Sequence, residues 1–295
     1  MPFTEQDLRE LLVDHGGTEP APAFLLAETV ERRGRRVRRR LRVTAVTAGA
    51  AAVACAATAV LVLPGLGDHE VPGPLTTSEV APPNDDVLKS GPVQRAIKSV
   101  VKLTATAPQC QRRIDGTGFV YAPRHVMTNA HVVAGSQGTV KVRSVAGKQQ
   151  EARVVLYDPV KDIAVLYVPG LTAAPLAFTP RASVGDDAAV VGFPKGGPLT
   201  ASAARIRARQ TATGLDIYHR SRVSREIYTI RGHMEPGDAG GPLLTPQGTV
   251  LGMNFAAALD TETPTAYALT AGQVASAAQQ ARNATAPVST EGCSD

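Results

Sequence analysis

Three short segments of the chain carry residues whose types and order suit acyl transfer. His131 lies in "TNAHVV", Asp162 lies in "DIAVL" 31 residues later, and Ala239 lies in "GDAGGP", 77 residues further on. An imidazole held by a carboxylate is a general base that takes the proton from an attacking hydroxyl. The order histidine, carboxylate, nucleophile is one known order of such a triad. The nucleophile position, however, carries an alanine.

The surroundings of the histidine and of the carboxylate favour these roles. His131 follows a predicted strand, "HVMTN", and opens a short helical turn, "AHVVAG", which places the imidazole at the edge of a barrel. A general base needs such a partly enclosed position. Asp162 begins an apolar strand, where its carboxylate can be buried against the histidine and fix its tautomer. Asp158 competes for this role, but it precedes Pro159 in a predicted turn, and Asp162 is preferred.

The glycines around position 239 predict a loop that binds negative charge. Gly237, Gly240 and Gly241 let the main chain curl so that successive N–H groups point at one spot. The amides of Gly237 and of residue 239 are the predicted donors to an oxyanion. Such a loop taken alone is often only a turn, and it gains meaning from the other two segments.

The alanine changes what these parts can do. A methyl group cannot attack a carbonyl, and removing the nucleophile from a triad of this kind costs on the order of 10⁶ in kcat. The hydroxyls of Ser221, Ser224 and Thr245 lie outside the loop and are not expected to replace it.

The elements that must position these residues are mostly strands. Short apolar runs with turn residues between them are typical of an all-β sandwich or barrel. The runs span residues 100–105, 118–122, 139–144, 162–168, 187–193, 226–232, 249–256 and 266–270. One amphipathic helix is predicted over residues 271–282, at the end of the fold.

The N-terminal part predicts a membrane anchor. Residues 32–42 hold eight arginines, and the rest of the chain has a net charge of −3, which argues against a nucleic-acid-binding face. Residues 43–63 carry no charge and would span about 31 Å as a helix, enough for a bilayer core. Because positive charge stays cytoplasmic, we expect a single-pass protein in the cell membrane with its N-terminus inside. A cleaved signal peptide, or a lipoprotein site at Cys55, are the alternatives.

These features divide the chain into four parts. Residues 1–42 are a basic cytoplasmic segment to which no activity is assigned, and residues 43–63 are the transmembrane helix. Residues 64–91, rich in Pro, Gly and small polar residues, are expected to be a flexible linker. Residues 92–295 are the extracytoplasmic domain.

The two cysteines beyond the predicted span are Cys110 and Cys293. Two thiols that bracket a domain outside the cytoplasm usually pair, so a disulfide is predicted. The alternative is a pair of free thiols in a reducing compartment.

Taken together, these segments make residues 92–295 resemble the chymotrypsin/trypsin-like serine proteases. The resemblance is strongest to the membrane-anchored periplasmic serine proteases of actinobacteria that are linked to acid and oxidative stress. It rests on "VMTNAHVVAG", "YDPVKDIAVL", "REIYTIRG" and "GGPLLTPQGTVLG".

The resemblance implies two perpendicular six-stranded β-barrels that act on polypeptides, with no metal and no cofactor. His131 would be the general base, Asp162 its orienting carboxylate, and position 239 the nucleophile. This sequence has no "IVGG"-like activation site before the domain, so Asp238 has no freshly cleaved N-terminus to pair with. His233, where those enzymes select the substrate side chain, does not support a trypsin-like preference for Arg or Lys.

Ala239 is compatible with two histories. The chain is either a natural pseudoprotease that binds extended peptides or senses envelope stress, or a working protease with a deliberate Ser→Ala change. A purely structural envelope protein is a third hypothesis, disfavoured because the histidine, the carboxylate and the glycines are all present.

Overall fold

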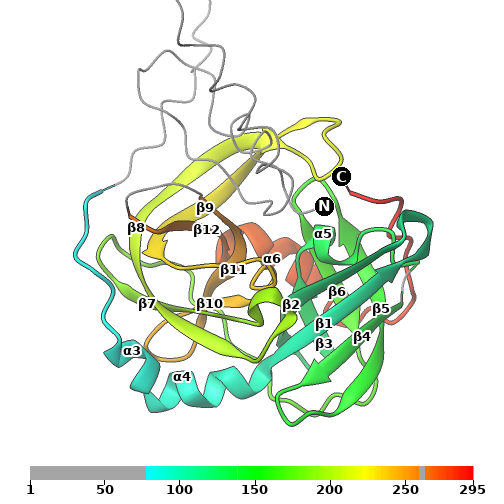
Figure 1. The fold of residues 1–295 in the computed structure, drawn as a ribbon, viewed down its shortest axis with the longest axis horizontal. Helices are drawn as coiled ribbons and strands as arrows, with labels where there is room; N and C mark the ends of the chain where they lie inside the picture. Colours follow the sequence, from blue (N-terminus) through cyan, green and yellow to red (C-terminus); the bar gives the residue numbers. More distant parts are fainter. Residues whose placement is uncertain (1–77, 138, 259–262, 295) are drawn as a thin grey trace, which may run out of the picture. The chain divides into compact units, whose positions relative to one another are not determined.

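Two closed β-barrels dominate the computed structural model, which describes residues 78–137, 139–258 and 263–294 (Figure 1). The strands follow the order β1-β2-β3-β6-β5-β4 around the first barrel and β10-β11-β12-β9-β8-β7 around the second. Every neighbouring pair is antiparallel. The two-barrel all-β fold with a C-terminal helix is therefore confirmed.

The first barrel is formed by β1 (Val100–Ala107), β2 (Arg112–Ala122), β3 (His125–Thr128), β4 (Thr139–Ser144), β5 (Gln149–Asp158) and β6 (Ile163–Tyr167). The second is formed by β7 (Asp187–Gly192), β8 (Thr200–Leu215), β9 (Arg222–Gly232), β10 (Pro242–Leu244), β11 (Val250–Ala257) and β12 (Thr265–Thr270). The helices are α3 (Asp86–Lys89), α4 (Gly91–Ala96), α5 (Ala130–Val133) and α6 (Ala271–Gln280), with 3₁₀ turns η1 (Ile97–Ser99), η2 (Pro108–Cys110) and η3 (Pro194–Gly196).

The burial of the strands explains their apolar sequences. β4 alternates exposed and buried residues, as a strand with one face in water should. In β3 all four residues are buried, because Val126 points into the first barrel while Met127 joins the core shared by the two barrels. That shared core also contains Val191 and Met253 of the second barrel and Val274 of α6. The barrels are thus joined by apolar packing close to the predicted site.

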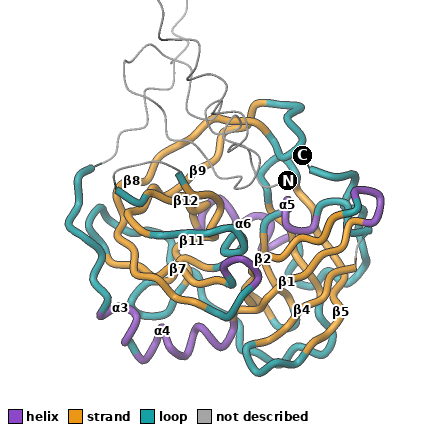
Figure 2. Tube along the Cα trace, in the orientation of Figure 1, coloured by secondary structure: helices purple, strands orange, loops and turns teal. Residues whose placement is uncertain are grey.

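Helix α6 follows the second barrel and lies between the two barrels (Figure 2), with Val274 in the shared core. Thr270 caps it, because its hydroxyl accepts a hydrogen bond from the Gln273 amide at 3.1 Å. Its buried residues, which include Val274 and Ala278, lie one helical turn apart. The helix predicted over residues 271–282 is confirmed with an end two residues earlier.

The segment before the first barrel differs from the expected linker over residues 78–91. Val87 of α3 and Val93 of α4 are buried in the shared core. Farther upstream, the Val80 carbonyl accepts a hydrogen bond from Arg231 at 2.6 Å. Composition indicated a flexible segment, but these few apolar side chains supply enough contact to hold it against the barrels.

The C-terminal tail runs beside the first barrel (Figure 1). A disulfide joins Cys110 to Cys293, with their Cα atoms 6.2 Å apart. The Val288 amide donates to the Val154 carbonyl of β5 at 2.9 Å.

In the part of the chain that the structure describes, no helix is both long and apolar enough to cross a bilayer. The predicted span at residues 43–63 and the basic segment 1–42 lie outside the described residues.

Candidate active site

His131 and Asp162 form a direct pair at the edge of the first barrel. His131 Nδ1 lies 2.8 Å from Asp162 Oδ2, and the His131 amide donates to Asp162 Oδ1 at 2.9 Å. The Asp162 side chain is completely buried, whereas 14% of the His131 side chain is exposed. A buried carboxylate with two such bonds fixes the position and the tautomer of the imidazole.

Strand pairing brings these two residues together. β3 pairs with β6, with Thr128 opposite Ala164, so the start of α5 lies beside the residue that precedes β6. The Asn129 side chain donates to the Asp162 carbonyl at 3.0 Å. Asp162 has a φ of +59°, a left-handed conformation that Asp adopts more readily than most residues.

Asp158, the competing carboxylate, has a different role. Its Oδ1 accepts a hydrogen bond from the Lys161 amide at 2.9 Å, within the turn that leads to Asp162. Asp162 therefore contacts the imidazole, whereas Asp158 stabilises the preceding turn.

The loop around Ala239 is shaped by its glycines. Gly237 and Gly240 have φ values of +101° and +84°, a region in which residues with a Cβ are strained. A Cβ on Gly237 would collide with the Phe193 carbonyl, and one on Gly240 with the Thr117 carbonyl. Among the described residues no acceptor is present for the amides of Gly237 or Ala239, so both N–H groups are available to an external oxyanion.

Ala239 belongs to the second barrel in sequence but packs against the first. Its partly buried methyl contacts the core of the first barrel, which includes Val132 and Val133 of α5. The next residue, Gly240, lies against the Asn129 amide, two positions before His131. The structure thus brings the nucleophile position next to the helix that carries the predicted base.

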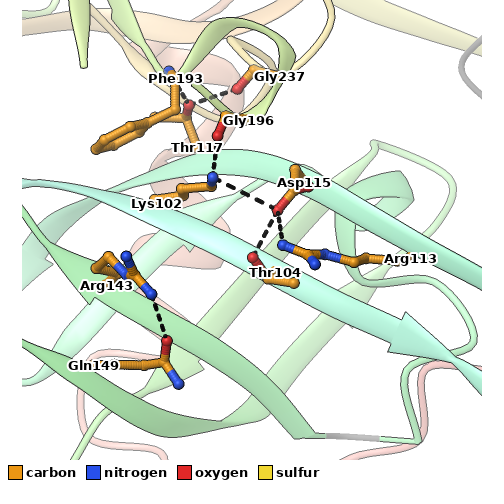
Figure 3. Close-up of polar contacts among 10 residues, drawn as sticks. All are labelled: Lys102, Thr104, Arg113, Asp115, Thr117, Arg143, Gln149, Phe193, Gly196 and Gly237. Carbon is orange, nitrogen blue, oxygen red and sulfur yellow. Dashed lines mark hydrogen bonds and ion pairs between the residues drawn. The ribbon is translucent and has the colours of Figure 1, made fainter. Parts of the chain in front are cut away.

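Thr117 of β2 ties the two barrels together at this point, and sequence reasoning missed it. Its buried hydroxyl donates to the Gly237 carbonyl at 2.6 Å and accepts from the Phe193 amide at 2.9 Å (Figure 3). Its own amide donates to the Ala239 carbonyl at 3.0 Å. The only local signal was its place in "GTGF", which reads as an ordinary strand.

Arg225 of β9 is a second residue that sequence reasoning missed. It is 1% exposed, and its guanidinium donates to the Val160 carbonyl at 2.6 Å and to the Leu215 carbonyl at 3.0 Å. Val160 lies two residues before Asp162, so a cation of the second barrel holds the turn that presents the carboxylate. The residue stands in "REIYTIRG", where nothing local distinguishes it from a solvated arginine.

Asp238 is buried without a cationic partner among the described residues. Its carboxylate accepts a hydrogen bond from the Glu235 amide at 2.9 Å, and burial raises its pKa to about 6. It lines a cavity of about 140 Å³ together with the exposed His233 and with Met234. The loop therefore carries an acid whose charged form is disfavoured by its surroundings.

The other hydroxyls considered for the nucleophile have different partners. Ser221 donates to Asp216 at 2.7 Å, Ser224 bonds Thr213 at 3.1 Å, and Thr245 bonds Thr249 at 2.8 Å.

Known proteins resemble this chain over the same region. The trypsin-like peptidase domain family matches residues 116–253. Serine protease Rv3671c of Mycobacterium tuberculosis (strain ATCC 25618 / H37Rv) is 49% identical over 214 residues, which cover 71% of this chain and 52% of that protein. A probable periplasmic serine endoprotease DegP-like of Chlamydia pneumoniae is 33% identical over 152 residues, covering 50% and 30%. The chain spans about half the length of the mycobacterial relative.

Solved structures agree in fold. The crystal structure of the Rv3671c protease from M. tuberculosis in its active form has a TM-score of 0.72 and 44% identity, and the match covers 78% of this chain and all of that one. A serine-to-alanine mutant of the same protease in its inactive form gives a TM-score of 0.63, with 72% of this chain and all of that one covered. These matches confirm the resemblance to actinobacterial serine proteases, and the chain belongs to the trypsin-like serine protease family.

Proposed function

We propose that this chain is a membrane-anchored trypsin-like serine endopeptidase-family protein that cleaves or binds polypeptides outside the membrane, and that with Ala239 at the nucleophile position it is proteolytically inactive as written. The observation that carries the proposal is the arrangement around Ala239. The Ala239 methyl packs against the core that includes α5, the helix that carries the Asp162-paired His131. Among the described residues, the amides of Gly237 and Ala239 have no acceptor.

The roles of the residues follow from this geometry. With a serine at position 239, His131 would take the hydroxyl proton as the oxygen attacked a peptide carbonyl. Asp162 would stabilise the resulting imidazolium, and the amides of Gly237 and residue 239 would donate to the oxyanion. With alanine there, a bound peptide meets the same donors, but no acyl-enzyme can form.

Placement outside the membrane is supported by the uncharged stretch 43–63, preceded by eight arginines, and by the name of the chlamydial relative, which is called periplasmic. A reporter fused after residue 295 should be active outside the cytoplasm. Activity of the reporter only in the cytoplasm would contradict this topology.

The nucleophile is tested with a fluorophosphonate probe on the full chain. The chain as written should not be labelled, whereas Ala239→Ser should be labelled and should gain kcat on the order of 10⁶ over the alanine form. Ala239→Val, which changes the same position without adding a hydroxyl, is the matched control. Adding His131→Ala to Ala239→Ser should abolish the gain. Specific labelling of the unmodified chain would reveal another nucleophile and contradict the assignment.

A natural peptide-binding pseudoprotease is the second candidate. It is favoured by the alanine at position 239, because the His131–Asp162 pair and the glycine loop around it are present. Extended peptides can bind such a fold by pairing with its strands. A folded Ala239→Ser variant that binds a peptide but neither reacts nor cleaves would support this candidate over the first.

A further inference from the structure

A basic hollow lies on the outer face of the first barrel, outside the candidate active site. It measures about 370 Å³, a size typical of small-ligand sites. Its lining residues are Lys102, Thr104, Thr106, Arg113, Lys141, Arg143 and Gln149, which come from β1, β2, β4 and β5. Figure 3 shows the Lys102 ammonium directed at the Gly196 carbonyl and Asp115, and the Arg143 guanidinium directed at Gln149.

The strand register concentrates positive charge in this hollow. Lys102 of β1 stands directly opposite Arg143 of β4, and Thr104 stands opposite Lys141. Like charges in directly opposite positions of an antiparallel pair destabilise it. A bound anion would remove this cost.

Two carboxylates, Asp115 and Glu151, stand beside these four cations and balance only half of their charge; the Lys102 ammonium also donates to the Gly196 carbonyl. Asp115 is shared, since it lies 4.0 Å from Lys102 and 3.4 Å from Arg113 and also accepts from Thr104 at 2.7 Å. Glu151 stands opposite Lys141 in the register, but no ion pair joins them among the described residues.

The remaining two cations are the least satisfied. The Arg143 guanidinium donates to the neutral Gln149 amide oxygen at 3.0 Å. The Lys141 ammonium has no hydrogen bond or ion pair within the described ranges. Two adjacent cations on β4 thus face the hollow without a carboxylate partner.

We propose that this hollow binds a ligand bearing two or more phosphate groups. An arginine fork matches the oxygens of a phosphate in a bidentate manner, and lysine ammonium groups add point charges. The Thr106 hydroxyl supplies a neutral donor on the same face. This inference does not depend on the proposed function, because none of these residues contacts His131, Asp162 or Ala239 through a hydrogen bond.

The test is a titration of the full chain, in a neutral detergent, with inorganic tripolyphosphate by calorimetry. We expect binding that weakens as sodium chloride rises from low to moderate ionic strength. The double variant Lys141→Gln/Arg143→Gln should bind at least about tenfold more weakly. The double variant Arg181→Gln/Arg222→Gln, which removes the same charge from exposed positions outside the hollow, should bind as the unmodified chain does.

A second arm identifies the source of the phosphate. Dihexanoyl phosphatidylinositol 4-phosphate, a lipid with two phosphate groups, is titrated below its micelle concentration, with dihexanoyl phosphatidylcholine as the comparison without net charge. If this phosphoinositide competes with tripolyphosphate, the hollow takes lipid headgroups; if it does not, the hollow takes free polyphosphates. Absence of tripolyphosphate binding, or equal weakening in both double variants, would overturn the proposal.

Discussion

The two barrels contribute to the candidate site in different ways. The first barrel supplies side chains: the completely buried Asp162 and the His131 imidazole 2.8 Å from it. The second barrel supplies main chain: two amides, held in place by left-handed glycines at positions 237 and 240. Its one side chain at the reacting position is the methyl of Ala239.

This difference explains why the shape of the loop does not require a hydroxyl at residue 239. A side-chain pair fails when either partner changes, because the remaining buried group loses its hydrogen bonds. A loop built from main-chain amides does not depend on the side chain at residue 239. The Ala239 methyl still packs on the first barrel, and its carbonyl still bonds Thr117. The packing and the main-chain bonds around residue 239 therefore accommodate the alanine.

Among the changes proposed in the first barrel, we expect the largest loss of kcat from a substitution of Asp162. In an Ala239→Ser background, Asp162→Asn should lower kcat by about 10⁴-fold, because an amide in place of the carboxylate favours the wrong imidazole tautomer. Peptide hydrolysis measures the loss. Asp158→Asn is the matched control and should leave kcat within a few-fold, since the Asp158 side chain bonds the Lys161 amide and not the imidazole. Equal losses in the two variants would contradict the assignment.

The tie between the barrels is tested at Thr117. In the same background, Thr117→Val should lower kcat by about 10²-fold with a smaller change in KM, because the Gly237 carbonyl and the Phe193 amide both lose their partner. Thr117→Ser keeps the hydroxyl and should restore most of the rate. If the serine and valine variants are equally impaired, packing rather than the hydroxyl positions the loop.

The second barrel's loop can be examined without any catalysis, through Asp238. Burial raises the pKa of this carboxyl from 3.8 to about 6, so the folded chain binds more protons than the unfolded chain between these values. The protonated Asp238 carboxyl is therefore favoured by folding. Its stabilising effect is fully present below pH 3.8 and is lost as the pH rises through about 6. Asp238→Asn cannot ionise, and we expect it to raise the free energy of unfolding at pH 7.5, relative to pH 4, by about 2 kcal/mol.

Urea unfolding at the two pH values measures this difference. Glu151→Gln serves as the control, because Glu151 is an exposed carboxylate on β5 of the first barrel and does not contact Asp238 among the described residues. An Asp238→Asn chain with the same pH dependence as the unmodified chain would show that the carboxylate is better solvated than its burial indicates.

Local patterns in the sequence determined a large part of this protein. The strand runs, the helix after Thr270, the glycine loop and the preference for Asp162 over Asp158 all follow from neighbours within a few residues of one another. Turn residues, capping hydroxyls and alternating apolar side chains act over such short distances, so they can be recognised without a partner from elsewhere in the chain.

Tertiary structure alone decided which distant groups meet. Thr117 contacts Gly237 across 120 positions, Arg225 bonds Val160 across 65, and Lys102 faces Arg143 only because β1 pairs with β4 in one register. Composition likewise missed the packing of Val87 against the shared core. These contacts depend on the closure of the two barrels and on their packing against each other. Neither can be predicted from the few residues that flank a position in the sequence.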